Sequence, residues 1–88
     1  MDAQAQFPEV ALVAQAIRAY LGRNPLASDT AAGIQRFWLP PQVGEVALTV
    51  VEAALAQLEA DGVVHRLEQA WAPASYLSAR AISGQRPQ

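Results

Sequence analysis

The stretch TVVEAALAQLEADGVVHR, residues 49–66, carries the pattern that decides the fold. Apolar residues recur in it at helical spacing, Gly62 can end the helix, and two adjacent valines then open a run typical of a β-strand. The predicted inward set is Leu48, Val51, Leu55 and Leu58, flanked by Val50 and Ala54. The start is open, since Thr49 and Glu52 match a capping box, whereas the periodicity extends back to about Glu45, the start that we favour.

A β-hairpin is expected after this helix. VVHRLE (63–68) and QAWAPASYL (69–77) are two short β-prone runs with a break near Gln69 and Ala70. Pro73 cannot donate a hydrogen bond to a ladder, so its strand should lie at a sheet edge or be bulged there. Residues 79–88 show no apolar period, which predicts a mobile tail after a domain of residues 1–78.

Two helices are expected before this stretch. A helix over about residues 8–21 is indicated by the spacing of Val10, Val13, Ile17 and Leu21. DTAAGIQRFWL, residues 29–39, predicts a second helix capped by Ser28 or Asp29. Gly33 lowers its helix propensity, which suggests close approach of another backbone or else neutral drift. The side chains expected in the core are Ile34, Phe37 and Trp38. The alternative is that the two aromatics face a partner.

Composition restricts the class of protein. The 88 residues make one domain, and 19 of the apolar residues are alanine, so each large apolar side chain matters to the core. There is no cysteine, which removes disulfides and thiolate metal sites. No apolar run is long enough to span a bilayer, and the N-terminus lacks the basic flank of a signal peptide. We therefore expect a soluble, cytoplasmic protein without membrane contact.

The predicted order of helix, short extended link, helix, helix and hairpin resembles the winged-helix fold. Residues 49–66 look like the third helix and first wing strand of bacterial winged-helix regulators. The positions that match their valine, two leucines, glycine and two apolar residues are Val50, Leu55, Leu58, Gly62, Val63 and Val64. The stretch at 29–39 is similar to the D-T-x-x-G-I helix with paired aromatics of small, poorly characterised bacterial winged-helix proteins. The resemblance covers about residues 8–78 and implies an α+β fold, with three helices and a C-terminal β-hairpin wing. Winged helices bind DNA in some proteins and other proteins in many, so both functions stay open.

The charge pattern departs from that of DNA-reading relatives, whose third helix offers basic and polar side chains to the duplex. The net charge is −2, and the chain has no positive residue between Arg36 and Arg66. Glu45, Glu52 and Glu59 are spaced by seven, which predicts one acidic stripe on the outer side of the third helix. Because phosphates would face this stripe, we favour protein contact over tight binding of duplex DNA.

Candidate contact residues follow from this choice. Trp71 lies just past the hairpin break and is either an interface anchor or part of the core. The outer side of the third helix, which carries Ala56 among other alanines, would lie against a partner, against a second copy of the chain, or against water. In the alternative reading, a DNA-binding transcriptional regulator would use His65 and Arg66 on the wing together with Arg80.

Catalysis is not expected. An enzyme needs a nucleophile with a base, paired carboxylates or a metal. The chain has one histidine, four scattered serines and no phosphate-binding glycine loop. His65 has no second histidine and no carboxylate at a ligand spacing. We therefore predict no catalytic residue, cofactor, metal or small-molecule substrate.

Overall fold

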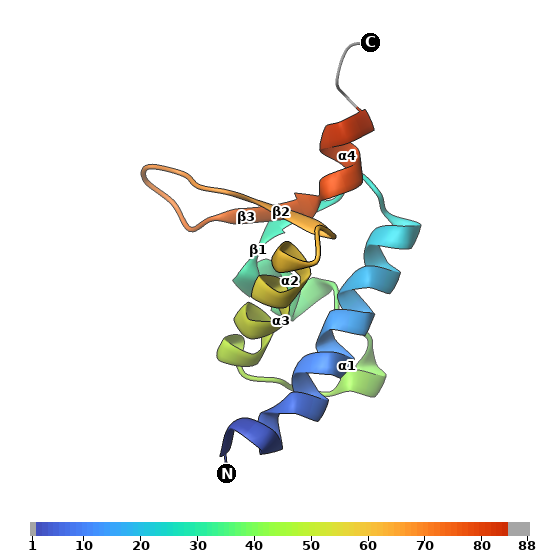
Figure 1. Ribbon diagram of the computed structural model, residues 1–88, viewed down its shortest axis with the longest axis vertical. Helices are drawn as coiled ribbons and strands as arrows, with labels where there is room; N and C mark the ends of the chain where they lie inside the picture. The colour runs from blue at the N-terminus through green and yellow to red at the C-terminus, as the bar shows by residue number, and fades with distance from the viewer. Residues whose placement is uncertain (1, 85–88) are drawn as a thin grey trace.

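The computed structural model describes the backbone of residues 2–84 and the side chains of residues 8–81. These residues form four α-helices and a three-stranded antiparallel sheet, so the fold is α+β as predicted. The last helix extends from the end of the sheet, away from the second and third helices (Figure 1). The helices are α1 (Asp2–Arg23), α2 (Ala31–Phe37), α3 (Leu48–Ala60) and α4 (Ala79–Gly84), with a 3-10 turn, η1 (Pro41–Val43). The strands are β1 (Ser28–Thr30), β2 (Val64–Leu67) and β3 (Ser75–Ser78).

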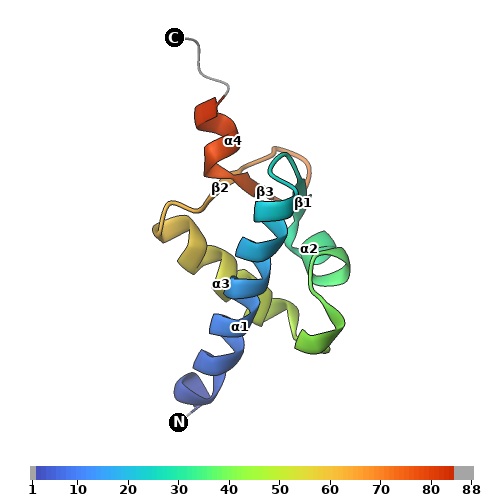
Figure 2. The ribbon, with the colours of Figure 1, turned by 90° about the vertical axis from the view of Figure 1, so that its right-hand side faces the viewer.

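The core lies mainly between α1 and α3, which cross each other (Figure 2). The predicted apolar positions meet there: the fully or almost fully buried side chains include Val13, Ile17, Leu21, Val51, Leu55 and Leu58. Burial of each such side chain stabilises the fold by about 1.5 to 3 kcal/mol relative to exposure. Ala54 is completely buried between them, and its small side chain lets the two helices approach closely.

Helix α1 is longer than predicted, because it begins at Asp2 rather than near Pro8. Pro8 lies inside the helix, where it removes one backbone N–H donor. The prediction treated this proline as a first-turn residue, its commonest helical position. None of the described helices is both long and apolar enough to cross a membrane.

The start of α2 differs from the prediction by one or two residues. Thr30 caps the helix, and its hydroxyl accepts a hydrogen bond from the N–H of Gly33 at 3.2 Å. Ser28 and Asp29 instead form β1 with Thr30. The Asp29 carboxylate accepts from the Thr30 N–H at 2.8 Å and occupies the space that a Cβ on Gly33 would need. The absence of a side chain at Gly33 therefore makes room for the Asp29 side chain and not for another backbone segment.

The two adjacent aromatics of α2 have opposite environments. Ile34 is fully buried, and Trp38 is 4% exposed with its ring stacked on Tyr20 at a centroid distance of 4.6 Å. Phe37 is 71% exposed, so its predicted burial is wrong. Successive helical residues point about 100° apart. The buried face of α2 is narrow, and it includes Trp38, four positions after Ile34, but not Phe37, three positions after it.

Both predicted starts of α3 are wrong. The helix begins at Leu48 after Ala47, which provides no side-chain cap, so the Thr49 capping box does not form. Gly44 precedes it with a φ of 76°, a conformation that favours glycine. The following link stays extended, with the Val46 carbonyl accepting a hydrogen bond from the Gln35 side chain at 2.8 Å. At the first helical position, Leu48 is 37% exposed rather than inward.

The sheet has the strand order β1-β3-β2. Thr30 pairs with Ser75 and Arg66 pairs with Tyr76, so β3 lies in the centre. The prediction that a strand contains Pro73, at a sheet edge or with a bulge, is therefore wrong, because pairing starts at Ser75 and Pro73 lies in the hairpin loop. The predicted helix stop is confirmed, since Gly62 has a φ of 76° at the end of α3.

The chain does not lose regular structure after residue 78. It continues from β3 into α4, which corrects the predicted tail for residues 79–84; residues 85–88 lie outside the described part. The Ala79 N–H donates to the Val63 carbonyl at 3.0 Å, and the buried Ser78 hydroxyl accepts from the Arg80 N–H at 3.2 Å. The first bond joins the start of α4 to the residue before β2, and the second joins it to the end of β3. Backbone and hydroxyl bonds of this kind do not produce an apolar periodicity in the sequence.

Candidate interaction surface

The loop between β2 and β3, residues 68–74, extends away from the helices, to the left in Figure 1. Trp71 lies in this loop and is 98% exposed, so the alternative that it belongs to the core is wrong. At the base of the loop the Gln69 amide donates a hydrogen bond to the Ser75 hydroxyl at 2.7 Å. Tryptophan is one of the residue types that are enriched among the anchor residues of protein interfaces.

A groove separates this loop from the first turns of α2 and α3; we call it the hairpin groove. Its volume is about 550 Å³. Its apolar lining consists of Ala31, Ala32, Leu48, Ala72, Pro73 and Ala74 with the ring of Tyr76. Its charged lining consists of Glu52, Arg66 and Glu68. Small side chains on its walls leave room, and the exposed edge of Leu48 offers an apolar contact.

The one arginine of the hairpin groove is already engaged. Arg66 forms an ion pair with Glu68. A hydrogen bond with Tyr76 raises the pKa of Arg66 above its ordinary value, with further contributions from Glu68 and Glu59. Glu52 forms no ion pair within the described side chains and is exposed. The hairpin groove therefore presents a net negative charge to an incoming group.

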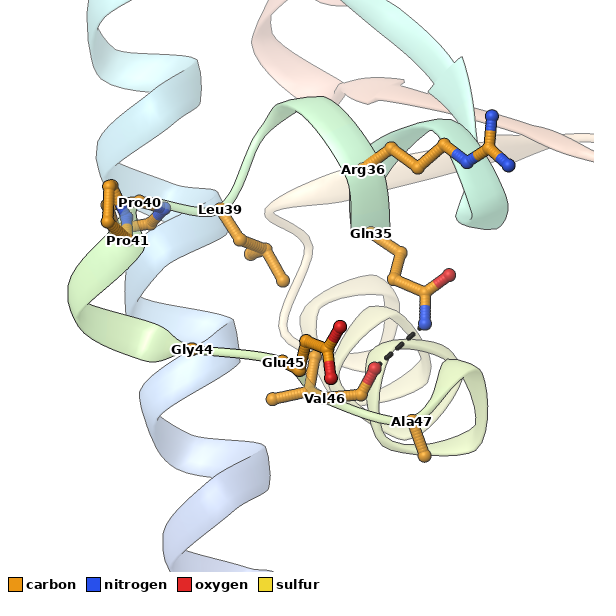
Figure 3. Close-up of a pocket in the computed structure, with 9 residues that line it drawn as sticks. All are labelled: Gln35, Arg36, Leu39, Pro40, Pro41, Gly44, Glu45, Val46 and Ala47. Carbon is orange, nitrogen blue, oxygen red and sulfur yellow. Dashed lines mark hydrogen bonds between the residues drawn. The ribbon is translucent and has the colours of Figure 1, made fainter.

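A second hollow lies where α2 passes into the link that precedes α3; we call it the link hollow (Figure 3). Leu39, Pro40 and Val46 line it together with Gln35, Arg36 and Glu45, and its volume is about 750 Å³. In Figure 3 the Arg36 side chain points away from Glu45, and the Gln35 amide is occupied by the Val46 carbonyl. The lining of this hollow thus carries one charge of each sign, Arg36 and Glu45, beside its apolar walls.

The two hollows adjoin. Ala32 and Arg36, one from each lining, are one helical turn apart on α2, and Ala47 and Leu48 are consecutive at the start of α3. A surface therefore continues from the hairpin loop, across the start of α3, to the link hollow. Sequence reasoning missed this surface, because Tyr76 and Leu48 enter it through the strand register and the late start of α3.

The predicted acidic stripe is only partly correct. Glu52 and Glu59 are exposed on α3, two turns apart, but Glu45 precedes the helix and does not share its face. The seven-residue spacing predicted a common face only on the assumption that all three residues were helical. Acidic side chains nevertheless accompany both hollows.

The alanine side of α3 is accessible. Ala56 is exposed, as are Ala53 and Ala60 at the neighbouring helical positions on the same side. These side chains leave a flat surface that no described segment covers. The prediction that this side faces outward is confirmed, and what it contacts stays a prediction.

The residues of the DNA-binding alternative do not converge. His65 and Arg66 are consecutive in β2 and so point to opposite faces of the sheet. Arg80, on α4, lines a separate hollow with Arg18 beyond the other end of the hairpin. Among the residues whose side chains are described, no group of three or more His, Cys, Asp or Glu is arranged to hold a metal ion.

Comparisons of the chain with protein-family models, with curated proteins and with solved structures found no match.

Proposed function

We propose that the chain is a winged-helix domain that serves as a non-catalytic protein-binding module. The element order α1-β1-α2-α3-β2-β3 supports the winged-helix assignment. So does the sheet order β1-β3-β2, with the β2–β3 hairpin as a wing that projects beside α3. The final helix, α4, is an addition to the three-helix arrangement that the resemblance implies.

The observation that carries the binding function is Trp71, which is 98% exposed on the loop above the hairpin groove. An isolated exposed tryptophan gains nothing for the folded chain, because its ring remains in water. In an interface the same ring is a frequent anchor, and its truncation commonly costs about 2 kcal/mol or more of binding free energy. The non-catalytic part rests on the sequence, with its single histidine and its lack of cysteine.

A matched pair of variants tests this function. We suggest capture of proteins from the native cell extract by immobilised wild-type chain, by Trp71→Ser and by Leu26→Ser. Leu26 is 78% exposed and precedes β1, at the end of the sheet away from the hairpin loop, so its variant removes a similar apolar surface elsewhere. A protein retained by wild type and Leu26→Ser but lost with Trp71→Ser is expected. Identical captures by all three would contradict the proposal.

Self-association is the form of protein contact that needs no unknown partner. Ala56→Arg would place a charged, bulky side chain on the alanine side of α3, and Trp71→Ala would remove the anchor. If two copies meet through these surfaces, sedimentation velocity across a concentration series should show a dimer that both variants dissociate. A wild-type chain that remains monomeric at millimolar concentration excludes this branch and leaves a different protein as partner.

The second candidate is a DNA-binding regulator. The observation in its favour is the start of α3, which lacks a side-chain cap and so leaves first-turn N–H groups for a phosphate. Glu52 in the same groove and the engagement of Arg66 by Glu68 oppose it. We expect no nanomolar binding of duplex DNA in fluorescence anisotropy at about 150 mM salt. Tight binding that Arg66→Ala weakens would establish the regulator instead.

A further inference from the structure

We propose that two copies of this chain pair through the free edges of their β2 strands, antiparallel and with Leu67 on the two-fold axis, so that one sheet continues across both copies. This inference goes beyond the proposed function, because it assigns a partner to a surface that does not include Trp71. It depends on the direction of the backbone groups of β2, on the spacing of two charges, and on one exposed leucine.

The outer side of β2 carries backbone groups that face away from the sheet. The Ala79 N–H donates to the Val63 carbonyl at 3.0 Å, which continues the register of the β2–β3 ladder. Bonding residues alternate along an antiparallel ladder, so every second residue from Val63, which includes Leu67, bonds to β3. The N–H and C=O of Arg66 therefore point outward. Figure 2 shows β2 and β1 on opposite sides of β3, and no described strand pairs with the outer side of β2. Such an edge can accept another strand.

The charges of the strand favour one register of this pairing. The outward groups belong to Val64, to Arg66 and to Glu68, which directly follows β2. If Arg66 or Glu68 lay opposite its own copy, like charges would meet, which is unfavourable. If Arg66 lay opposite Val64, which is buried, it would gain no opposite charge. When Arg66 lies opposite Glu68 of the second copy, two-fold symmetry makes the favourable contact twice. The two residues already form an ion pair within each chain, so four charges alternate in sign across the dimer.

The same register covers an exposed apolar side chain. Leu67 lies midway between Arg66 and Glu68, and therefore faces Leu67 of the second copy across the axis. The Cβ atoms of directly opposite residues are roughly 4.5 to 5.5 Å apart, and closest where the pair is not hydrogen-bonded, as here. Leu67 is 43% exposed in the single chain, so this contact removes apolar surface from water.

Charge variants test the pairing by sedimentation velocity, in a concentration series that extends to the millimolar range. Arg66→Glu and Glu68→Arg each turn two attractive contacts into repulsive ones, so either chain alone should dimerise at least about tenfold more weakly than wild type. An equal mixture of the two variants places opposite charges at both contacts again, and should form a heterodimer. Arg23→Glu and Glu9→Arg make the same changes in charge at exposed positions of α1 and should leave the dimer unchanged. Circular dichroism should show a folded chain for each variant.

The absence of cysteine from the chain allows a separate test of the register. Leu67→Cys places two thiols opposite each other, at a separation that a disulfide bridges after a small shift. His65→Cys is the control on the same face of β2, because its two thiols would lie roughly 13 Å apart along the paired strands. With oxidised glutathione as the oxidant, Leu67→Cys should form a disulfide-linked dimer on a non-reducing gel, and His65→Cys should form much less.

Three outcomes would overturn the inference: a wild-type chain that is monomeric at millimolar concentration, a mixture of the charge variants that forms no heterodimer, or cross-linking of His65→Cys as readily as Leu67→Cys. A dimer that Ala56→Arg dissociates and Arg66→Glu does not would also contradict it, because that dimer would use the alanine side of α3.

Failure of the proposed function is a separate result. The capture experiment can be repeated with Trp71→Ser and Leu26→Ser in the monomeric Arg66→Glu chain. Capture that depends on Trp71 in this background supports the proposed function whether or not wild type dimerises. Loss of that dependence, with the dimer intact, leaves the pairing of β2 and removes the role of the loop.

Discussion

The contrast between Phe37 and Trp38 gives the sharpest stability prediction. Trp38 is 4% exposed and stacks on Tyr20 with an angle of 12° between the rings, so Trp38→Ala leaves a cavity and removes the stack. Truncation of a buried tryptophan typically costs about 3 to 5 kcal/mol. A domain of this length has a total stability of about 4 to 13 kcal/mol. Phe37→Ala, one residue away, removes a side chain that is 71% exposed and should change stability by less than about 0.5 kcal/mol.

Thermal unfolding monitored by circular dichroism measures both effects. For a domain of 60 to 100 residues, about 1 kcal/mol corresponds to 4 to 8 °C in Tm, so a loss of about 3 kcal/mol lowers Tm by roughly 12 to 24 °C. If Trp38→Ala is unfolded at all temperatures, Trp38→Phe supplies a folded variant with a smaller loss. A Trp38→Ala protein that melts like wild type, or a Phe37→Ala protein that is equally destabilised, would refute the assignment of the core.

Three further predictions follow from local geometry. Thr30→Ala should cost about 1 kcal/mol, because it removes the cap of α2, whereas Thr49→Ala should change the unfolding midpoint little, because its predicted capping box is not formed. Gly33→Ala should stabilise the Asp29→Ala variant by up to about 1 kcal/mol but should not stabilise wild type, in which the new methyl group collides with the Asp29 carboxylate; a gain in the single variant would contradict this reading. In Trp71→Phe the remaining tryptophan should be shielded from acrylamide and emit at short wavelength, and strong quenching would show that it is not buried.

The sequence by itself determined the elements whose evidence is local and repeated. The spacing of Val13, Ile17 and Leu21 and that of Leu55 and Leu58 indicated the two core helices, because a helix that buries one face must repeat its apolar residues every three or four positions. Gly62 indicated the turn into β2, because its positive φ is a conformation that other residues avoid. The hairpin followed from the same kind of local signal, whereas the exposure of Trp71, which the sequence left open, was decided by the structure.

Tertiary structure decided what depends on contacts between distant segments. Ser28, Asp29 and Thr30 form a strand because β3 supplies its hydrogen-bonding partner, and a three-residue strand has no period of its own to read. Trp38 rather than Phe37 enters the core because Tyr20 on α1 provides the surface on which it stacks. Glu45 does not belong to the predicted stripe, because Gly44 and the hydrogen bond from Gln35 to Val46 keep the link before α3 extended. A spacing of seven residues places side chains on one face only when all of the residues between them are helical.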